Sequence, residues 1–125
     1  GTNPSLGNGA LYSEWTRFGT RGEVSIHLKA GSTTTFGSGL WTFSLPDGWT
    51  PFTSVAISDA GDNNNVGVGW AYDNSAGAPY AVAAYVFNGS SKIFVVQTGA
   101  YVYNAVPFSW GTSDQLHLTV PVRLA

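Results

Sequence analysis

The feature that most constrains the fold of this chain is a series of short runs in which apolar and polar residues alternate. The clearest run is 23–29, in which Val24, Ile26 and Leu28 alternate with polar residues. Residues two apart in a β-strand share one face, so this run predicts a strand with one buried face and one solvated face. No stretch of the chain combines good helix formers with apolar residues at helical spacing. The pattern therefore predicts an all-β protein.

Similar runs recur along the 125 residues, at 11–18, 40–45, 52–58, 66–72 and 115–120. Clusters of Gly, Asn, Pro and Ser separate these runs and predict turns. About eight or nine strands follow. Short antiparallel strands at this spacing favour a β-sandwich of jelly-roll type, and we expect residues 1–125 to form a single such domain. Gly67 and Gly69 alternate with large residues, which predicts that another layer or backbone packs closely over the glycine side.

The segment 80–96 departs from the alternating pattern because both of its faces are apolar. Its two halves read Tyr-Ala-Val-Ala-Ala-Tyr-Val-Phe at 80–87 and Ile-Phe-Val-Val at 93–96. A strand of a two-layer sandwich turns only one face toward the core, and an exposed second face would form a larger apolar patch than soluble monomers normally carry. Either loops of the chain or a second subunit must cover it. We expect a subunit interface, with candidate residues Tyr80, Val82, Tyr85, Val86, Phe87, Phe94 and Val96.

The low charge content independently argues for covered surface. Charged residues make up 10% of the chain, against about 25% in an average soluble protein. The net charge is -2 without a run of like charges, so the chain lacks the basic surface that binds nucleic acid. No apolar run approaches the roughly 20 residues of a membrane span. We expect neither nucleic acid nor membrane insertion.

Residues that carry catalytic chemistry are sparse. The absence of cysteine excludes disulfides, thiolate zinc sites and cysteine nucleophiles. His27 and His117 lie on the polar faces of alternating runs, where we expect them to be solvated. A two-histidine metal site would need their strands to be neighbours and a carboxylate nearby, and the sequence shows neither. No serine triad is recognisable, because the chain has no nucleophile-elbow motif. No glycosidase carboxylate pair is recognisable either, because all five aspartates stand in or beside turns. We expect no enzymatic activity and no cofactor, and a polysaccharide depolymerase is the enzymatic alternative.

Loops rich in oxygen and aromatic groups suit binding better than catalysis. The loop around Asp59 and Asp62 holds several oxygen ligands but lacks the order of a calcium-binding EF-hand loop, so a plain surface loop is favoured over a metal site. Aromatic rings stack on the apolar faces of sugars, while amides and hydroxyls bond to sugar hydroxyl groups. Alternatively, loop tryptophans can fold back over the core. The candidate ligand-binding residues are Trp49, Trp110, Asp62, Asn63, Asn64 and Asn74.

Several motifs follow one another in the first third of the chain. They are NPSLGNG at 3–9, a strand that leads to Arg17 and Gly19, the alternating run 24–28, GSTTTFGSG at 31–39 and LWTFSLP at 40–46. This order resembles a C-terminal domain of tail fibre and minor tail proteins of actinobacterial phages. The resemblance covers about residues 3–46 and identifies no binding residue.

The resemblance implies a homotrimeric, receptor-binding tip at the C-terminal end of a longer fibre protein. Such a domain would belong to the virion, act outside the cell and attach the phage to a host cell-surface glycan, and threefold repetition would raise the avidity of weak sugar contacts. The alternative is a monomeric carbohydrate-binding module of a secreted bacterial protein. The mass of the particle in solution distinguishes the two.

Overall fold

The computed structural model describes residues 2–52, 63–87, 90–97 and 99–125, and within these ranges it contains strands and loops but no helix. The expected all-β class is thus confirmed. The eight strands are β1 (Ala10–Phe18), β2 (Arg21–Lys29), β3 (Thr42–Ser44), β4 (Asn63–Asp73), β5 (Ala78–Phe87), β6 (Lys92–Gln97), β7 (Ala100–Tyr101) and β8 (Gln115–Arg123). None of the described residues belongs to a helix with the length and apolar character needed to cross a membrane.

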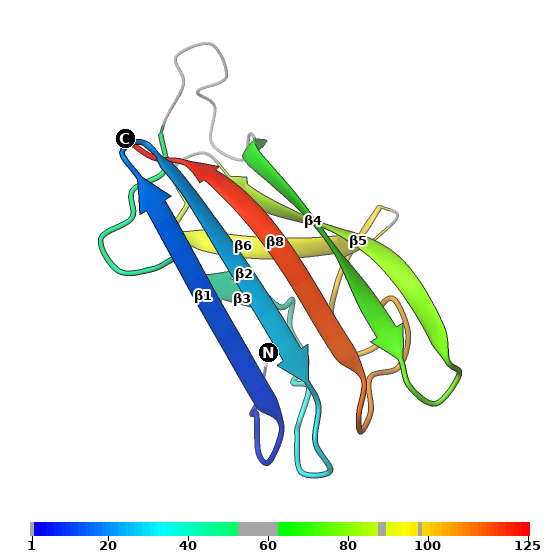
Figure 1. Ribbon diagram of the computed structural model, residues 1–125. Coiled ribbons are helices and arrows are strands. Elements are labelled where there is room, and N and C mark those ends of the chain that lie inside the picture. Colours follow the sequence, from blue (N-terminus) through cyan, green and yellow to red (C-terminus); the bar gives the residue numbers. More distant parts are fainter. Residues whose placement is uncertain (1, 53–62, 88–89, 98) are drawn as a thin grey trace.

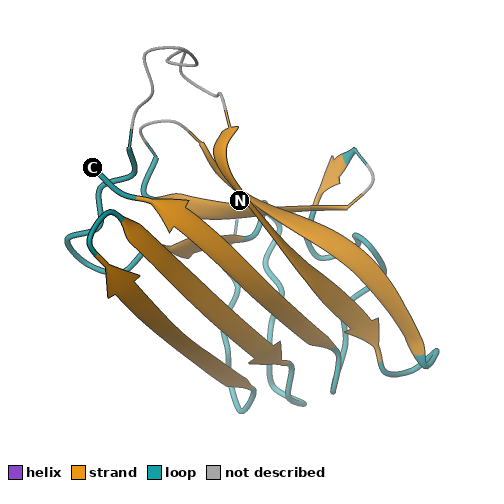
Figure 2. Cartoon of the chain, turned by 45° about the horizontal axis from the view of Figure 1, so that its top comes forward, coloured by secondary structure: helices purple, strands orange, loops and turns teal. Residues whose placement is uncertain are grey.

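The strands form one antiparallel sheet in the order β1-β2-β8-β4-β5-β6-β3, with β7 beside β6. The sheet curls on itself, so that β6 and β3 lie behind β2 and β8 (Figures 1 and 2). The two layers expected for a sandwich are therefore two parts of a single hydrogen-bonded sheet. Strands β1 and β3 stand at its free edges.

The core lies inside the curl and follows the predicted alternation. In the central pair of strands, Val24 lies opposite Val120 and Ile26 opposite Leu118, and all four side chains are buried. Opposite residues of antiparallel strands share a face, so this register places the apolar positions of both strands together. β5 and β6 complete the core from the other layer with Val82, Ala84, Val86, Ile93 and Val95.

Strand boundaries differ from the sequence-based expectation mainly around β3 and β7. The run 40–45 yields only a three-residue strand, because the backbone N–H groups of Trp41 and Leu45 donate to the carbonyl oxygens of Val102 and Ser91. The two-residue strand β7 was not predicted. Of the predicted strand 52–58, all but Phe52 lies outside the described residues.

The N-terminal motifs pack against each other and hold the loop after β2 in place. Ser5 and Thr35 exchange two backbone hydrogen bonds, with N···O distances of 3.0 and 2.8 Å. The backbone N–H of Asn8 donates to Thr33 Oγ1 at 2.8 Å, and the N–H of Thr33 donates back to Asn8 Oδ1 at 3.0 Å. Gly7 has a φ of 55°, and a Cβ there would collide with the Thr33 carbonyl group. The residues that carry the family resemblance therefore act as a structural clasp.

The alternating glycines of β4 pack closely against a neighbouring backbone, as the sequence predicted. A Cβ on Gly69 would collide with the carbonyl oxygen of His117, and one on Gly67 with that of Thr119. Both of these oxygens belong to β8, the hydrogen-bonded neighbour of β4. The close layer over the glycine side is thus the backbone of β8.

Candidate ligand-binding face

The two loop tryptophans proposed as ligand contacts are part of the core. Trp49 and Trp110 are each only 7% exposed. Trp110 packs between Trp41 and Phe108, at ring-centroid distances of 4.7 and 4.5 Å, and its indole N–H donates to the Val106 carbonyl oxygen at 3.0 Å. Neither ring has a free face for a sugar, so the structure corrects their assignment as ligand-binding residues. Both close over the core, which is the alternative that the sequence left open.

The other loop candidates do not form a site that the structure can describe. Asn74 is exposed in the β4–β5 turn, and its backbone N–H donates to the buried carboxylate of Asp114 at 2.8 Å. Asp62 and the loop proposed for calcium lie outside the described residues, and Asn63 and Asn64 are described only as backbone of β4. Among the described residues, no group of three or more His, Cys, Asp or Glu side chains is arranged to hold a metal ion.

The seven candidate interface residues divide between the two faces of the β5–β6 hairpin. Val82 and Val86 point into the chain's own core and are 6% and 0% exposed, which corrects their assignment to an interface. Tyr80 is half-buried and packs against Phe108 at a centroid distance of 5.3 Å. The four residues that alternate with the core positions lie on the outer face, and they are Tyr85, Phe87, Phe94 and Val96.

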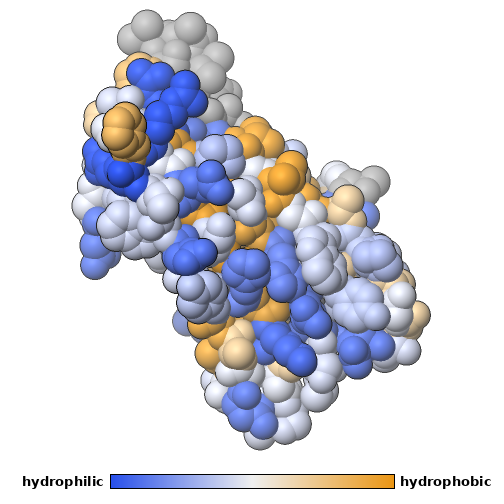
Figure 3. Space-filling view, viewed as in Figure 1, coloured by the Kyte–Doolittle hydropathy of each residue, from blue (hydrophilic) through white to orange (hydrophobic). Residues whose placement is uncertain are grey.

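The outer face of β4, β5 and β6 is an apolar surface on which the β5 and β6 side chains are half-buried by the described residues. Its rings form a chain from Phe87 through Phe94 to Tyr101, with centroid distances of 5.0 and 6.0 Å. On β4, Val66 and Val68 extend this surface and are 52% and 68% exposed. Hydrophobic residues gather around the upper half of β4 in Figure 3. We call this surface the hairpin face.

A shallow groove crosses the hairpin face. Its floor contains Ala81 and Ala83, and its walls include Tyr85, Val96 and Tyr101. The small side chains of the two alanines leave room between the larger neighbours. Tyrosine walls over an apolar floor suit contact with another apolar or aromatic surface.

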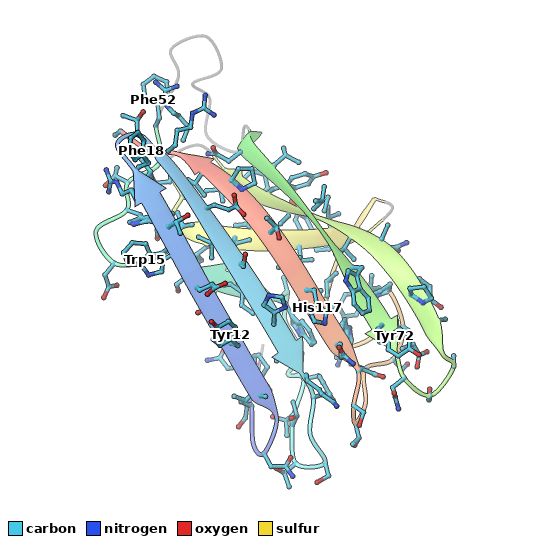
Figure 4. All side chains as sticks on the ribbon, viewed as in Figure 1. Tyr12, Trp15, Phe18, Phe52, Tyr72 and His117 are labelled. Atoms are coloured by element: carbon cyan, nitrogen blue, oxygen red, sulfur yellow. The ribbon has the colours of Figure 1, made fainter. Side chains whose placement is uncertain are left out.

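A second feature, which we call the ring row, crosses four strands of the same sheet. Tyr12 on β1 lies opposite His27 on β2, His27 opposite His117 on β8, and His117 opposite Trp70 on β4. Successive ring centroids are 6.1, 4.8 and 4.6 Å apart. Strands in a sheet are about 4.8 Å apart, so the row spans about 14 Å. Figure 4 shows Tyr12, His117 and Tyr72 at the same end of the sheet.

The histidines of the ring row contact each other directly. His27 Nδ1 and His117 Nδ1 are 2.6 Å apart, and His117 Nε2 lies 2.9 Å from Gln115 Oε1. An amide oxygen can only accept, so His117 donates from Nε2 and its Nδ1 lone pair accepts the N–H of His27. Burial and the neighbouring charge of His27 lower the pKa of His117. Trp70 stacks on the His117 ring with an interplanar angle of 13°.

Polar groups border the ring row, and both of its ends are accessible. The hydroxyl group of Tyr12 donates to Glu14 Oε2 at 2.9 Å, and this contact raises the pKa of Tyr12. Tyr12 and Trp70 remain 58% and 40% exposed. The row therefore offers aromatic surface beside carboxylate, amide and imidazole groups, a combination that suits sugar rings and their hydroxyl groups.

Sequence reasoning placed the two histidines correctly on polar strand faces but did not pair them. Their strands are 90 positions apart and become neighbours only because β8 inserts between β2 and β4. Periodicity fixes the face on which a residue lies, whereas the strand order is a property of the whole fold. The local signals for the row were the polar-face positions of the two histidines and the alternation of Trp70 with the glycines of β4.

One curated protein shows similarity along almost the whole chain. It is the Mu-like prophage FluMu defective tail fiber protein of Haemophilus influenzae (strain Rd), which is 30% identical over 129 aligned positions that include 98% of this chain. The chain spans only 18% of the length of that relative. No family model and no solved structure matches the chain.

The similarity agrees with the resemblance carried by the N-terminal motifs and extends it to the strands that follow residue 46. It does not address the actinobacterial origin or the C-terminal position that the motifs implied. The relative is a prophage protein named as a tail fibre component. Almost the whole chain is therefore similar to a part of a phage tail fibre protein.

Proposed function

We propose that this chain is a receptor-binding domain at the C-terminal tip of a phage tail fibre, where it attaches the virion to a host cell-surface carbohydrate as a homotrimer. The similarity to a prophage tail fibre protein supports the fibre role. Attachment requires binding rather than catalysis, so the proposal needs no enzymatic group or cofactor. The actinobacterial origin stays a prediction.

The ring row is the observation that carries the proposed glycan binding. Tyr12 and Trp70 expose ring surface at its two ends, about 14 Å apart, which suits an extended oligosaccharide better than a single sugar. Glu14 and Gln115 supply hydrogen-bonding groups beside the rings. Sugar sites combine stacking with hydrogen bonds in this way.

The hairpin face supports the proposed trimer. It joins exposed valines of β4 to the aromatic rings of β5, β6 and β7 without a described loop over it. Burial of such a surface against neighbouring copies would stabilise the assembly by about 25 cal/mol per Å² of apolar area. The number three comes from the family resemblance, and the apolar face gives each copy a surface to contribute. In this arrangement the ring row of every copy would present a separate sugar site, and linked sites raise avidity.

The proposed glycan site is tested with an array of bacterial cell-wall and capsular polysaccharides. We expect the purified chain to bind a subset of them, and Trp70→Ala to weaken that binding at least tenfold through the loss of one stacked ring. Phe18→Ala is the matched control, because Phe18 is 90% exposed and lies about 20 Å along β1 from Tyr12. Equal binding by the wild-type chain and Trp70→Ala would exclude the ring row as the sugar site.

A monomeric carbohydrate-binding module of a secreted bacterial protein is the second candidate. The ring row favours it as much as it favours a fibre tip, because an exposed aromatic strip on a sheet serves either protein. The similarity to a tail fibre protein and the open hairpin face favour the fibre. Only the fibre proposal requires an oligomer.

A further inference from the structure

The contact between His27 and His117 brings two imidazole nitrogens together on an accessible part of the sheet. The two Nδ1 atoms are 2.6 Å apart, and His27 is exposed while His117 is half-buried. Both residues lie on long central strands held in register by β2–β8 pairing on either side of them. The backbone therefore holds both rings in place before any ligand arrives.

The rest of the ring row orients these nitrogens. His117 donates from Nε2 to Gln115 Oε1 at 2.9 Å, so in the neutral ring the lone pair is on Nδ1, the atom that faces His27. Metal-binding histidines characteristically donate their other ring N–H to an acceptor, which fixes the tautomer and raises the basicity of the ligating nitrogen. Trp70 stacks on the other side of His117 at 4.6 Å and limits rotation of the ring.

We propose that His27 and His117 bind a divalent transition-metal ion of the Zn²⁺, Ni²⁺ or Cu²⁺ class through their Nδ1 atoms. Neutral imidazole is a preferred ligand of these ions, whereas Mg²⁺ and Ca²⁺ prefer oxygen. On metal binding, the proton leaves His27 Nδ1 and the neutral ring carries its N–H on Nε2, so that the Nδ1 lone pairs of both histidines face the ion. This inference goes beyond carbohydrate attachment and does not depend on it.

Metal binding requires only a small change in the distance between the two Nδ1 atoms. Two nitrogens at about 2.05 Å from a tetrahedral zinc ion are about 3.4 Å apart, so the present separation of 2.6 Å must widen by about 0.8 Å. Rotation about the side-chain torsions of the exposed His27 supplies this change without moving the strands. No carboxylate of the described residues joins the pair, so water or an external donor, such as a sugar hydroxyl group held on the ring row, must fill the remaining positions.

The site is tested by titrating Zn²⁺ into the tag-free, chelator-treated chain at neutral pH. Isothermal titration calorimetry should show one Zn²⁺ bound per chain, and Mg²⁺ at the same concentration should give no signal. His27→Gln and His117→Gln should each weaken Zn²⁺ binding at least tenfold. Thr119→Ala is the control, because Thr119 is exposed two residues from His117 on the same face and carries no ligating nitrogen.

Nuclear magnetic resonance provides a readout that needs no variant. His27 and His117 are the only two histidines of the chain, so its imidazole spectrum contains two rings, and Zn²⁺ should shift the resonances of both. Three results would overturn the inference: no Zn²⁺ uptake by the wild-type chain, full uptake by both glutamine variants, or a shift of one ring alone. Zn²⁺ binding without any polysaccharide binding would leave the metal site intact and reject only the glycan proposal.

Discussion

At the residue scale, the tryptophans show how the same side chain serves two purposes in this chain. Trp110 is 7% exposed and joins an aromatic group that closes the core, with Trp41 and Phe108 on either side. Trp15 on β1 is 55% exposed and makes an edge-to-face contact with Trp49, at a centroid distance of 5.5 Å. Trp110 should therefore contribute much more to the stability of the fold than Trp15.

We expect Trp110→Ala to lower the free energy of unfolding by about 3 to 5 kcal/mol, because it removes a large buried ring and leaves a cavity. Trp15→Ala should cost about 1 kcal/mol, since most of its surface is already in water. Urea denaturation followed by circular dichroism measures both. Similar losses for the two variants would mean that Trp110 does not belong to the core.

The tryptophans also show what sequence alone could not decide. Residue type and loop position were compatible with a sugar platform and with a lid over the core. The choice depends on which strands lie beneath each loop, and that follows from the curl of the whole sheet. In the same way, His27 and His117 were assigned to the correct faces, but their contact depends on the pairing of β2 with β8.

At the scale of elements, alternation predicted the long strands well. The apolar positions of β2 and β8 face the core, where all but the half-buried Leu28 are buried, and their polar positions face outward, as the runs 23–29 and 115–120 indicated. The short strands β3 and β7 were harder to predict, because their lengths are set by tertiary hydrogen bonds and not by periodicity. In the N-terminal clasp, turn residues of one motif form hydrogen bonds with turn residues of another.

The hairpin of β5 and β6 permits a matched pair of substitutions on one strand. Val86→Asp places a charge in the core and should destabilise the fold by about 4 kcal/mol or more. Ala83→Asp places the same charge on the hairpin face, where Ala83 forms part of the groove floor. That variant should keep its unfolding midpoint as an isolated chain but fail to form the proposed trimer.

Thermal unfolding and size-exclusion chromatography separate the two effects. An Ala83→Asp chain that assembles like the wild type would show that the hairpin face is not an interface. A Val86→Asp chain with unchanged stability would contradict the orientation of β5.

At the scale of the whole molecule, the structure places two surfaces with different properties on one curled sheet. The ring row lies across β1, β2, β8 and β4 and combines rings with polar groups, whereas the hairpin face lies across β4, β5 and β6 and is almost entirely apolar. The two surfaces meet at β4, where Trp70 of the ring row lies opposite Ala81 of the groove floor, so the proposed trimer would bury the hairpin face and leave the Tyr12 end of the ring row open.

The mass of the particle in solution tests this account most directly. Multi-angle light scattering of the wild-type chain at micromolar concentration should give three times the 13.2 kDa of one chain. A mass of 13.2 kDa under the same conditions would contradict the trimer and favour the secreted, monomeric module.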